Sequence, residues 1–271
     1  MEDLKNDGIS IITIVLNGES LIEETIQSVL QQKNINLEYI IIDGGSTDET
    51  LNKISKYNDK IDLVISEPDE GIYHAINRGI SISKYPYVGL IHCGDCFKTD
   101  ALSKVYKAFN STNADIVYGD IEIKEEKNND FIITTHIANH KYLEKKMSIF
   151  HPATFVKLSV YKNIGVYNTE YRSAADYEFF LRLFQQNFTF VHLPFLAATF
   201  RSGGISGKNF KLSLKENYKI RYKHLGLFAA IIYFYKTIIT YSFFSLRKKI
   251  ITGLIGGNFY FKIKQRRTKN R

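Results

Sequence analysis

The sequence predicts an α/β protein built on a mostly parallel sheet with flanking helices. In the first 110 residues, continuous apolar runs alternate with segments whose apolar residues recur at helical spacing. The runs lack the alternating polar positions of a half-exposed strand, which indicates burial on both faces. Strands and helices that alternate in this way form βαβ units with helices on both sides of the sheet.

Four strands and four helices are expected in this first part. The strands cover residues 9–17, 37–43, 61–66 and 85–93, and the helices cover residues 20–32, 46–57, 71–83 and 99–110. Ser20 is placed to cap the first helix, with Glu23 completing a capping box, and Ser46 or Thr47 is placed to cap the second.

The pattern is less regular in the second half of the chain. We expect two paired strands at 114–123 and 131–137, a strand and a short helix at 151–165, a helix at 173–187, a strand at 188–200 and a glycine-rich loop at 201–207.

Composition fits one large domain or one domain with an appendage. The 271 residues are 44% hydrophobic and 14% aromatic, which excludes disorder. Two cysteines exclude a disulfide framework and fit a reducing compartment. The first eight residues are polar and acidic, so we expect no signal peptide and a cytoplasmic location.

Charge is distributed unevenly along the chain. From Arg201 onward there are 17 Lys and Arg against one acid, Glu216, whereas the first 200 residues hold 19 basic and 27 acidic side chains. A basic tail on an acidic body indicates an anionic partner, either a membrane surface or nucleic acid. No aromatic-basic recognition motif is present, so nucleic acid is not expected.

Polar residues gather where the predicted strands end. In an open α/β sheet the ligand lies beyond the carboxyl ends of the strands. The residues there are Asn17, Asp43-Gly44-Gly45-Ser46, Glu67-Pro68-Asp69 and His92-Cys93-Gly94-Asp95. Carboxylates at three of four ends are more than stability requires, and they indicate a ligand site.

Asp43 has two interpretations. Its carboxylate can accept hydrogen bonds from a base or a ribose, while Gly44 and Gly45 let the ligand approach the backbone. Alternatively, Asp43 forms an Asx turn, and Ser46 or Thr47 caps the next helix. The segment alone does not decide between them.

The segment from residue 66 to residue 79 suits a diphosphate. Asp69 and Gly71 lie in a loop, and His74, Asn77 and Arg78 share one face of the helix that follows. A helix start with a nearby arginine is a favourable place for phosphate groups. The alternative is an ordinary exposed polar face.

Asp95 is a candidate ligand for a hard divalent cation that would neutralise a diphosphate. The Cys93-x-x-Cys96 spacing also suggests a zinc or redox site. We disfavour zinc because it normally takes four protein ligands and no second cysteine pair exists. We disfavour a redox pair because such pairs usually lie at a helix start, and here an Asp lies between the two cysteines. Asp176, near the start of a predicted helix, is either a general base or a charge that favours the helix dipole.

Taken together, these segments resemble family 2 glycosyltransferases of the GT-A fold, the type that builds bacterial surface polysaccharides. The resemblance covers roughly residues 8–205. In order, the matching pieces are "SIITIVLNGESLIEETIQSVLQQ", "LEYIIIDGGSTDET", "SEPDEGIYHAINRGI", "LIHCGDCF", "HPATF", "AADYEFFLRL" and "GGIS".

The resemblance implies inverting transfer of a sugar from a nucleotide-diphosphate-sugar donor. Asp43 would bind the nucleobase, Asp95 would hold Mg²⁺ or Mn²⁺, and Asp176 would deprotonate the acceptor hydroxyl. His151 and Asp176 would lie on the acceptor side, and Arg201 with residues 203–206 would form a lid. The implied donor-binding set is Thr13, Asn17, Asp43, Gly44, Asp69, Gly71, Asn77, Arg78, Gly94, Asp95 and Arg201.

The chain departs from the family pattern at two positions. The metal motif usually reads Asp-x-Asp-Asp, and here a single carboxylate, Asp95, remains. His92 could add a nitrogen ligand, or the diphosphate and water could complete the shell. His74 stands where relatives commonly carry Asp, which leaves the identity of the sugar open.

The predicted domains are a glycosyltransferase domain at residues 1–210 and a basic, aromatic-rich helical tail at 211–271. The nucleotide-binding half covers about 8–120, and the acceptor half about 121–210. Residues 225–246 contain one charge, Lys236. We favour interfacial helices on the inner face of the cytoplasmic membrane over a membrane span or a dimerisation element.

The resemblance also implies partners. The acceptor would be a saccharide, with a lipid-linked one favoured, and the oligomeric state stays open, a dimer included.

Two rival hypotheses remain. A nucleotidyltransferase would carry a glycine-rich basic signature near the first strand, which is absent here. A non-catalytic membrane-binding module would not need polar and acidic residues at the ends of four strands. A dehydrogenase is disfavoured because G-x-G-x-x-G is absent after the first strand.

Overall fold

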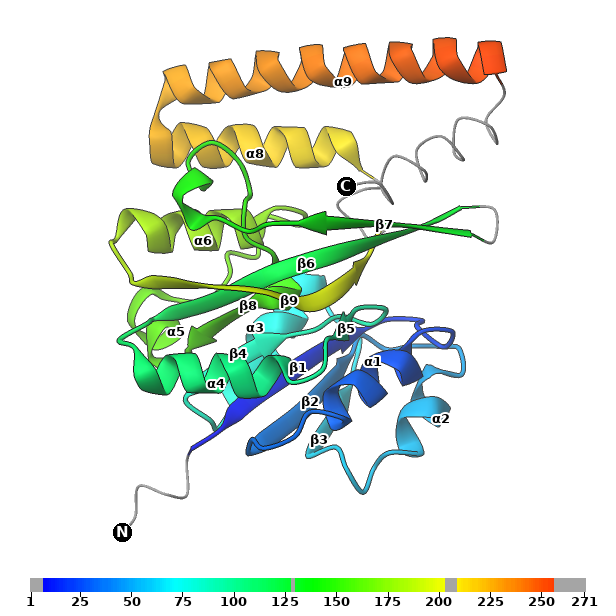
Figure 1. Cartoon of the computed structure of the whole chain (residues 1–271), viewed down its shortest axis with the longest axis vertical. Helices are drawn as coiled ribbons and strands as arrows, with labels where there is room; N and C mark the ends of the chain where they lie inside the picture. Colours follow the sequence, from blue (N-terminus) through cyan, green and yellow to red (C-terminus); the bar gives the residue numbers. More distant parts are fainter. Residues whose placement is uncertain (1–6, 128–129, 203–208, 256–271) are drawn as a thin grey trace. The chain divides into compact units, whose positions relative to one another are not determined.

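The computed structural model describes residues 7–127, 130–202 and 209–255, and it divides into two compact units (Figure 1). Unit 1 comprises Met1–Glu122 and His136–Phe200. Unit 2 comprises Ile123–Thr135 and Arg201–Arg271.

Four parallel strands form the first half of the sheet, in the order β3-β2-β1-β4. They are β1 (Ile9–Val15), β2 (Leu37–Asp43), β3 (Leu63–Ser66) and β4 (Tyr87–Leu90). Every residue of β1 is buried, as its continuous apolar run predicts. The register aligns Val15 with Asp43 and Asp43 with Ser66, so the strands end at one edge.

The sheet continues beyond β4 in the order β8-β6-β9-β5. They are β8 (Thr154–Lys157), β6 (Ile116–Lys127), β9 (Phe190–Arg201) and β5 (Cys96–Phe97), and β7 (Asp130–His136) pairs with β6 as expected. β8 runs antiparallel to both β4 and β6. Parallel pairing therefore stops at β4, and the α/β fold is more mixed than the sequence indicates.

The predicted helices of unit 1 are present. They are α1 (Ile22–Leu30), α2 (Thr50–Ser55), α3 (Ile72–Ile82), α4 (Ala101–Ser111), α5 (Leu158–Ile164) and α6 (Ala175–Gln185), with short 3₁₀ turns η2 (His140–Tyr142) and η3 (His151–Ala153). α3 packs against β1 and β2. Gly79 allows this approach, because a Cβ there would lie 2.5 Å from a methyl carbon of Ile12.

The predicted helix caps are wrong. α1 begins at Ile22 without a side-chain cap, and Glu23 forms ion pairs with two lysines of the α2 region instead of a capping box. α2 begins at Thr50, several residues later than expected, because Ser46 and Thr47 are engaged by the loops at the ends of β1 and β2.

Unit 2 contains a helical hairpin of α8 (Phe210–Leu225) and α9 (Leu227–Ile255), joined at Gly226 with a φ of 87°. Figure 1 shows the two helices side by side. Within residues 7–127, 130–202 and 209–255, no helix combines the length and apolarity needed to cross a bilayer.

Candidate functional site

The ends of the parallel strands are tied together by backbone hydrogen bonds. The amide of Gly44 donates to the Val15 carbonyl at 2.9 Å, and the amide of Cys93 donates to the Ile14 carbonyl at 3.2 Å. The amide of Glu67 donates to the Asp43 carbonyl at 3.0 Å. The loops that follow β1, β2, β3 and β4 therefore lie at one edge of unit 1, as the sequence predicts.

Asp43 is fully buried, and hydrogen bonds surround its carboxylate. Oδ2 accepts from the Gly45 amide at 3.1 Å, the Ser46 amide at 2.9 Å and the Ser66 hydroxyl at 2.7 Å. Oδ1 accepts from the Ser46 hydroxyl. In this structure Asp43 therefore forms the Asx turn that was the second interpretation of the segment. Nucleobase binding by Asp43 stays a prediction, and it requires one of these donors to give way.

Asn17 links the first two loops. It has a left-handed backbone with a φ of 49°, and its Oδ1 accepts from the Thr47 amide at 2.9 Å. Its own amide donates to the Ser46 hydroxyl at 2.7 Å. Thr13 is different: its hydroxyl is buried within the core, 3.1 Å from the Tyr39 hydroxyl. Asn17 therefore lies at the edge of the sheet, and Thr13 lies beneath it.

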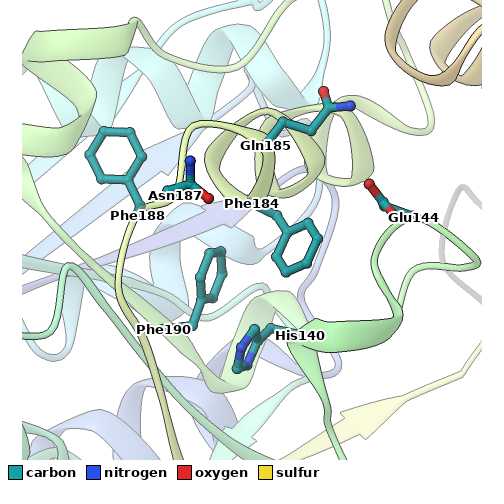
Figure 2. A pocket seen from close by; sticks show the side chains of 7 residues that line it. All are labelled: His140, Glu144, Phe184, Gln185, Asn187, Phe188 and Phe190. Atoms are coloured by element: carbon teal, nitrogen blue, oxygen red, sulfur yellow. The ribbon is translucent and has the colours of Figure 1, made fainter.

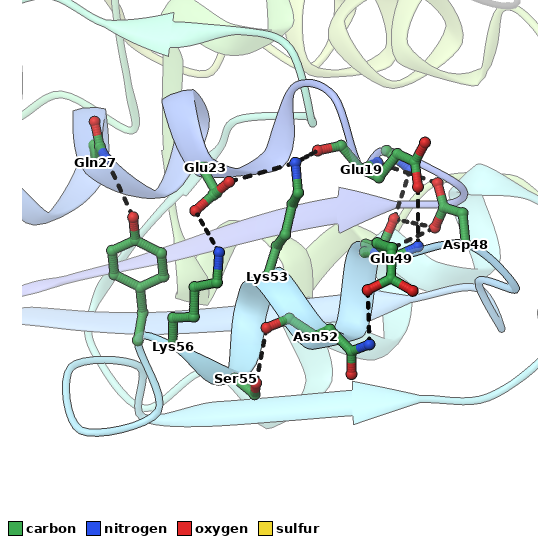
Figure 3. A network of polar contacts seen from close by, with 12 residues as sticks. Glu19, Glu23, Gln27, Asp48, Glu49, Asn52, Lys53, Ser55 and Lys56 are labelled. Carbon is green, nitrogen blue, oxygen red and sulfur yellow. Dashed lines mark hydrogen bonds and ion pairs between the residues drawn. The ribbon is translucent and has the colours of Figure 1, made fainter.

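A polar network fixes the β1–α1 loop to α2 (Figure 3). Lys53 donates to the Glu19 carbonyl at 2.7 Å and lies 3.4 Å from a carboxylate oxygen of Glu23. Burial acts to raise the pKa of Glu23, but hydrogen bonds from Lys56 and Lys53 and their charges outweigh it and lower the pKa. The loop that carries Asn17 is thereby held in place before any ligand arrives.

Asp69 lies directly over Gly44. A Cβ built on Gly44 would lie 2.7 Å from Oδ2 of Asp69, so a side chain at residue 44 would displace this carboxylate. Oδ1 of Asp69 accepts from the Gly71 amide at 2.9 Å, and Gly71 has a φ of 135°. The structure therefore brings together three members of the predicted donor-binding set.

The polar residues of α3 have other partners. The Asn77 side chain donates to the Tyr167 carbonyl at 2.8 Å and accepts from the Tyr167 amide at 3.0 Å. Arg78 pairs with Glu67 at 2.7 Å, and this hydrogen bond lowers the pKa of Glu67. His74 lies 3.7 Å from Glu70. Asn77 anchors a loop, and diphosphate binding by Asn77 or Arg78 stays a prediction.

The loop carrying Asp95 is fastened to α1. The Thr25 hydroxyl accepts from the Gly94 amide at 2.9 Å and donates to the Asp95 carbonyl at 2.9 Å. Gly94 has a φ of 96°, and Asp95 is only 4% exposed. Burial lowers the pKa of His92 to about 4, so its imidazole is neutral at pH 7. Nδ1 of His92 is buried without a hydrogen-bond partner.

The donor set suits a metal ion that is held mainly by its substrate. Among the described residues, no three His, Cys, Asp or Glu side chains cluster as a metal centre. Magnesium usually keeps several waters and takes one or two carboxylates plus substrate phosphates. Asp95 fits that description as the single carboxylate, and Nδ1 of His92 lies in the same loop without a hydrogen-bond partner.

The cysteines of this loop lack the features of a redox or zinc site. Burial, followed by the charges of Glu24 and Asp95, raises the pKa of Cys96 to about 12, so its thiol stays protonated at neutral pH. The thiolate is the form that binds metal and attacks disulfides. The Sγ atom of Cys93 instead lies 3.6 Å from the Gly18 carbonyl.

A chain of aromatic contacts connects the Asp95 loop to Asp176. The rings of His92 and His151 are 5.4 Å apart, and Nε2 of His151 lies 2.8 Å from the Tyr167 hydroxyl. Tyr167 stacks on Tyr73 at 5.8 Å. The Tyr73 hydroxyl donates to Oδ1 of Asp176 at 3.2 Å, in the first turn of α6.

Sequence reasoning missed Tyr73 and Tyr167. Tyr73 lies inside a segment that carries the family resemblance, but its helical spacing marks it as an apolar core position. Tyr167 lies in an irregular loop without a motif. The local sequence pattern cannot predict that Tyr73 contacts Asp176 or that Tyr167 contacts His151, because each contact joins two separate segments of the chain.

Arg201 belongs to unit 2, where its Nη2 lies 3.4 Å from Oε2 of Glu126. The glycine-rich segment 203–206, predicted to form a lid with it, lies outside the described residues. The lid stays a prediction.

A cavity of about 490 Å³ lies at the carboxyl-terminal end of α6 (Figure 2). Aromatic rings and polar side chains line it: His140, Glu144, Phe184, Gln185, Asn187, Phe188 and Phe190. The His140 and Phe190 rings stack at 5.0 Å. Asp176 lies at the opposite end of the same helix, so this cavity is separate from the edge where the strands end.

The comparisons with known proteins identify the family. A family model described as Glycosyl transferase family 2 matches residues 10–202. The chain belongs to glycosyl transferase family 2. The matched range contains every strand of the sheet except the first residue of β1, and it contains all the candidate site residues.

Relatives of this family 2 chain carry glycosyltransferase names. It is 28% identical over 180 residues to the PGL/p-HBAD biosynthesis glycosyltransferase of Mycobacterium bovis, covering 65% of this chain and 69% of that protein. It is 26% identical over 126 residues to glycosyltransferase GlyG of Streptococcus pneumoniae, covering 45% of this chain and 42% of that protein.

Solved structures show the same fold. S. aureus TarS 1–349 in complex with UDP-GlcNAc matches with a TM-score of 0.64 at 17% identity, over 79% of this chain. The chain spans 64% of that TarS structure, which is less than two thirds. The predicted GT-A fold and the predicted family are confirmed.

Proposed function

We propose that this chain is an inverting glycosyltransferase that moves a sugar from a nucleotide-diphosphate sugar to a hydroxyl of a saccharide acceptor. The contact path from the Asp95 loop through His92, His151, Tyr167 and Tyr73 to Asp176 carries this proposal. These contacts join Asp176 to the Asp95 loop within unit 1, which supports a base and a diphosphate site in one packed assembly, as a single displacement requires.

Asp176 is the proposed general base. A base must be a carboxylate or imidazole within reach of the acceptor hydroxyl. His151 is excluded from this role, because burial lowers its pKa well below the ordinary value and its Nε2 is engaged by Tyr167. The carboxylate of Asp176 is half-buried at the start of a helix, and the Tyr73 hydroxyl orients it.

The donor is proposed to bind across the strand ends, between the Asp43 loop and the Asp95 loop. Enzymes of this family generally use a divalent metal ion. We propose that Asp95, with His92 as second candidate, would hold Mg²⁺ or Mn²⁺, whose charge would stabilise the leaving diphosphate. TarS binds UDP-GlcNAc, so a UDP-hexosamine is the first donor to test.

The proposed acceptor is a lipid-linked saccharide at the inner face of the cytoplasmic membrane. The M. bovis relative is named for PGL/p-HBAD biosynthesis, and the basic C-terminal segment of this chain suits an anionic surface.

Nucleotide binding tests the proposal. We would titrate UDP, GDP, dTDP and CMP by calorimetry with Mn²⁺ and with chelator, using wild type, Asp95→Ala and the control Asp59→Ala. Asp59 is an exposed carboxylate in the loop between α2 and β3. One diphosphate should bind, about tenfold or more weakly in Asp95→Ala or in chelator. If no nucleotide binds to wild type, the donor site is misassigned.

A further inference from the structure

The hairpin of unit 2 buries only one side of α9. Phe210 of α8 stacks on Tyr241 of α9 at 4.0 Å, and Tyr218 meets Phe234 at 5.9 Å. The guanidinium of Arg221 lies 4.2 Å from the ring centre of Tyr233. These aromatic contacts hold the two helices together along the side of α9 that faces α8.

The other side of α9 carries an exposed apolar stripe. Its members are Phe228, Ile232, Tyr235, Ile239, Phe243 and Leu246, with exposed fractions of 79%, 52%, 62%, 66%, 62% and 60%. Their spacings of three and four residues place them on one face of the helix. At a rise of 1.5 Å per residue, the stripe is about 27 Å long.

Such a stripe is not ordinary surface. Single exposed apolar side chains are common on soluble proteins, but a continuous row marks an interaction site. A helix that is apolar around its whole circumference is expected to be buried. α8 packs on one side of α9, and the stripe on the other side is the part of this helix available to a partner.

The positive charge of the hairpin indicates an anionic partner for the stripe. Residues 209–255 contain nine Lys and Arg and one acid, Glu216. Lys211, Lys215, Lys219 and Lys223 recur every fourth residue on the exposed side of α8. Lys236 and Arg247 of α9 are exposed and follow Ile232 and Phe243 of the stripe by four residues, so both charges flank the stripe. Two copies packed stripe to stripe would bring these like charges together, whereas an anionic surface attracts them.

We propose that the stripe on α9 docks in the interface of a bilayer that contains anionic lipid. The stripe runs along the helix rather than across its end, so α9 would lie parallel to the membrane plane. Lys236 flanks the stripe, and its long stem lets the ammonium reach the headgroups. The purpose of this docking rests on the proposed function, because docking would bring the enzyme to a lipid-linked acceptor. The structural argument for docking depends only on residues of unit 2.

Vesicle binding tests the proposal with the full-length chain. We would measure co-sedimentation with vesicles of phosphatidylcholine alone and of phosphatidylcholine with about one third phosphatidylglycerol. Binding should require the anionic lipid and weaken in about 0.5 M NaCl, where charges are screened within a few ångströms. The variant Ile232→Gln/Ile239→Gln removes two exposed side chains of the stripe and should bind at least about tenfold more weakly.

The control is Tyr222→Gln, which replaces an exposed ring of α8 outside the stripe and should bind like wild type. Unchanged vesicle binding by Ile232→Gln/Ile239→Gln, or no binding by wild type, would overturn the proposal. A wild-type oligomer that the stripe variant turns into a monomer, with lipid binding intact, would assign the stripe to a second copy instead. Nucleotide calorimetry on the same variants reports on the donor site separately, because none of the three positions belongs to it.

Discussion

Tyr73 is the side chain through which the candidate base is tied to the rest of the site. Its hydroxyl donates to Oδ1 of Asp176, and its ring stacks on Tyr167, whose hydroxyl in turn meets His151. It is buried, so its position is set by packing. A carboxylate that accepts a hydrogen bond is favoured in its charged form, which is the form a general base needs.

Replacing Tyr73 by Phe should lower kcat by about tenfold or more and leave the KM for the donor nearly unchanged, because the base loses its orienting donor. The acidic limb of the pH–rate profile should move to higher pH, since the carboxylate binds a proton more readily without that hydrogen bond. Steady-state kinetics across pH would measure both effects.

Tyr57→Phe is the matched control, because it removes a hydroxyl that accepts from Gln27 on the surface between α1 and α2. A pH profile of Tyr73→Phe that superimposes on wild type would argue against a positioning role.

At the scale of elements, α1 acts as the support of the Asp95 loop. One hydroxyl, that of Thr25, satisfies both the Gly94 amide and the Asp95 carbonyl, and all three groups are buried. An unsatisfied buried backbone group is costly, so this side chain fixes the left-handed turn at Gly94. The helix thus positions a carboxylate that lies 70 residues later in the chain.

Thr25→Val keeps the shape of the side chain and removes its hydroxyl. We expect the free energy of unfolding to fall by about 1–3 kcal/mol, because the Gly94 amide loses its partner. Metal-dependent donor affinity should fall as well. Urea unfolding and calorimetry would measure the two effects.

Thr25→Ser retains the hydroxyl and should recover most of both losses. If Thr25→Val weakened the fold without changing donor affinity, the Asp95 loop would not depend on α1 for its function.

At the scale of the whole molecule, buried histidines make unit 1 sensitive to acid. Burial is the largest cause that lowers the pKa of His92, His140 and His151, to about 4 in the case of His92. In the unfolded chain these groups titrate near pH 6.5. Below that pH the unfolded chain binds more protons than the folded one, so stability rises with pH from about 4 to 6.5 and gains nothing above it.

We therefore expect a lower urea midpoint at about pH 5 than at about pH 7.5. His140→Phe should flatten the dependence by at most about 1.4 kcal/mol per pH unit, the effect of one proton, while keeping a ring beside Phe190. In this variant the Tyr118 hydroxyl loses its contact with Nδ1 of His140 and keeps the backbone amide of residue 140 as a donor, which lowers stability at every pH and does not alter the slope. An unchanged slope in His140→Phe would show that His140 does not contribute.

The sequence by itself determined the elements and the edge at which they meet. Its continuous apolar runs required strands buried on both faces, and alternation with helices required parallel pairing from β3 to β4. The polar ends of those strands had to lie together, because parallel strands share one direction. Asn17, Asp43, Asp69 and Asp95 could be found in this way from local pattern alone.

Only the tertiary structure decided which partners these side chains have. It turned Asp43 inward onto Ser46 and Ser66, assigned Asn77 to the Tyr167 backbone and placed Tyr73 against Asp176. It also gave β8 its antiparallel place beside β4 and left a row of apolar side chains of α9 exposed. Hydrogen bonds and packing between distant segments depend on three-dimensional proximity, and periodicity along the chain carries no information about that proximity.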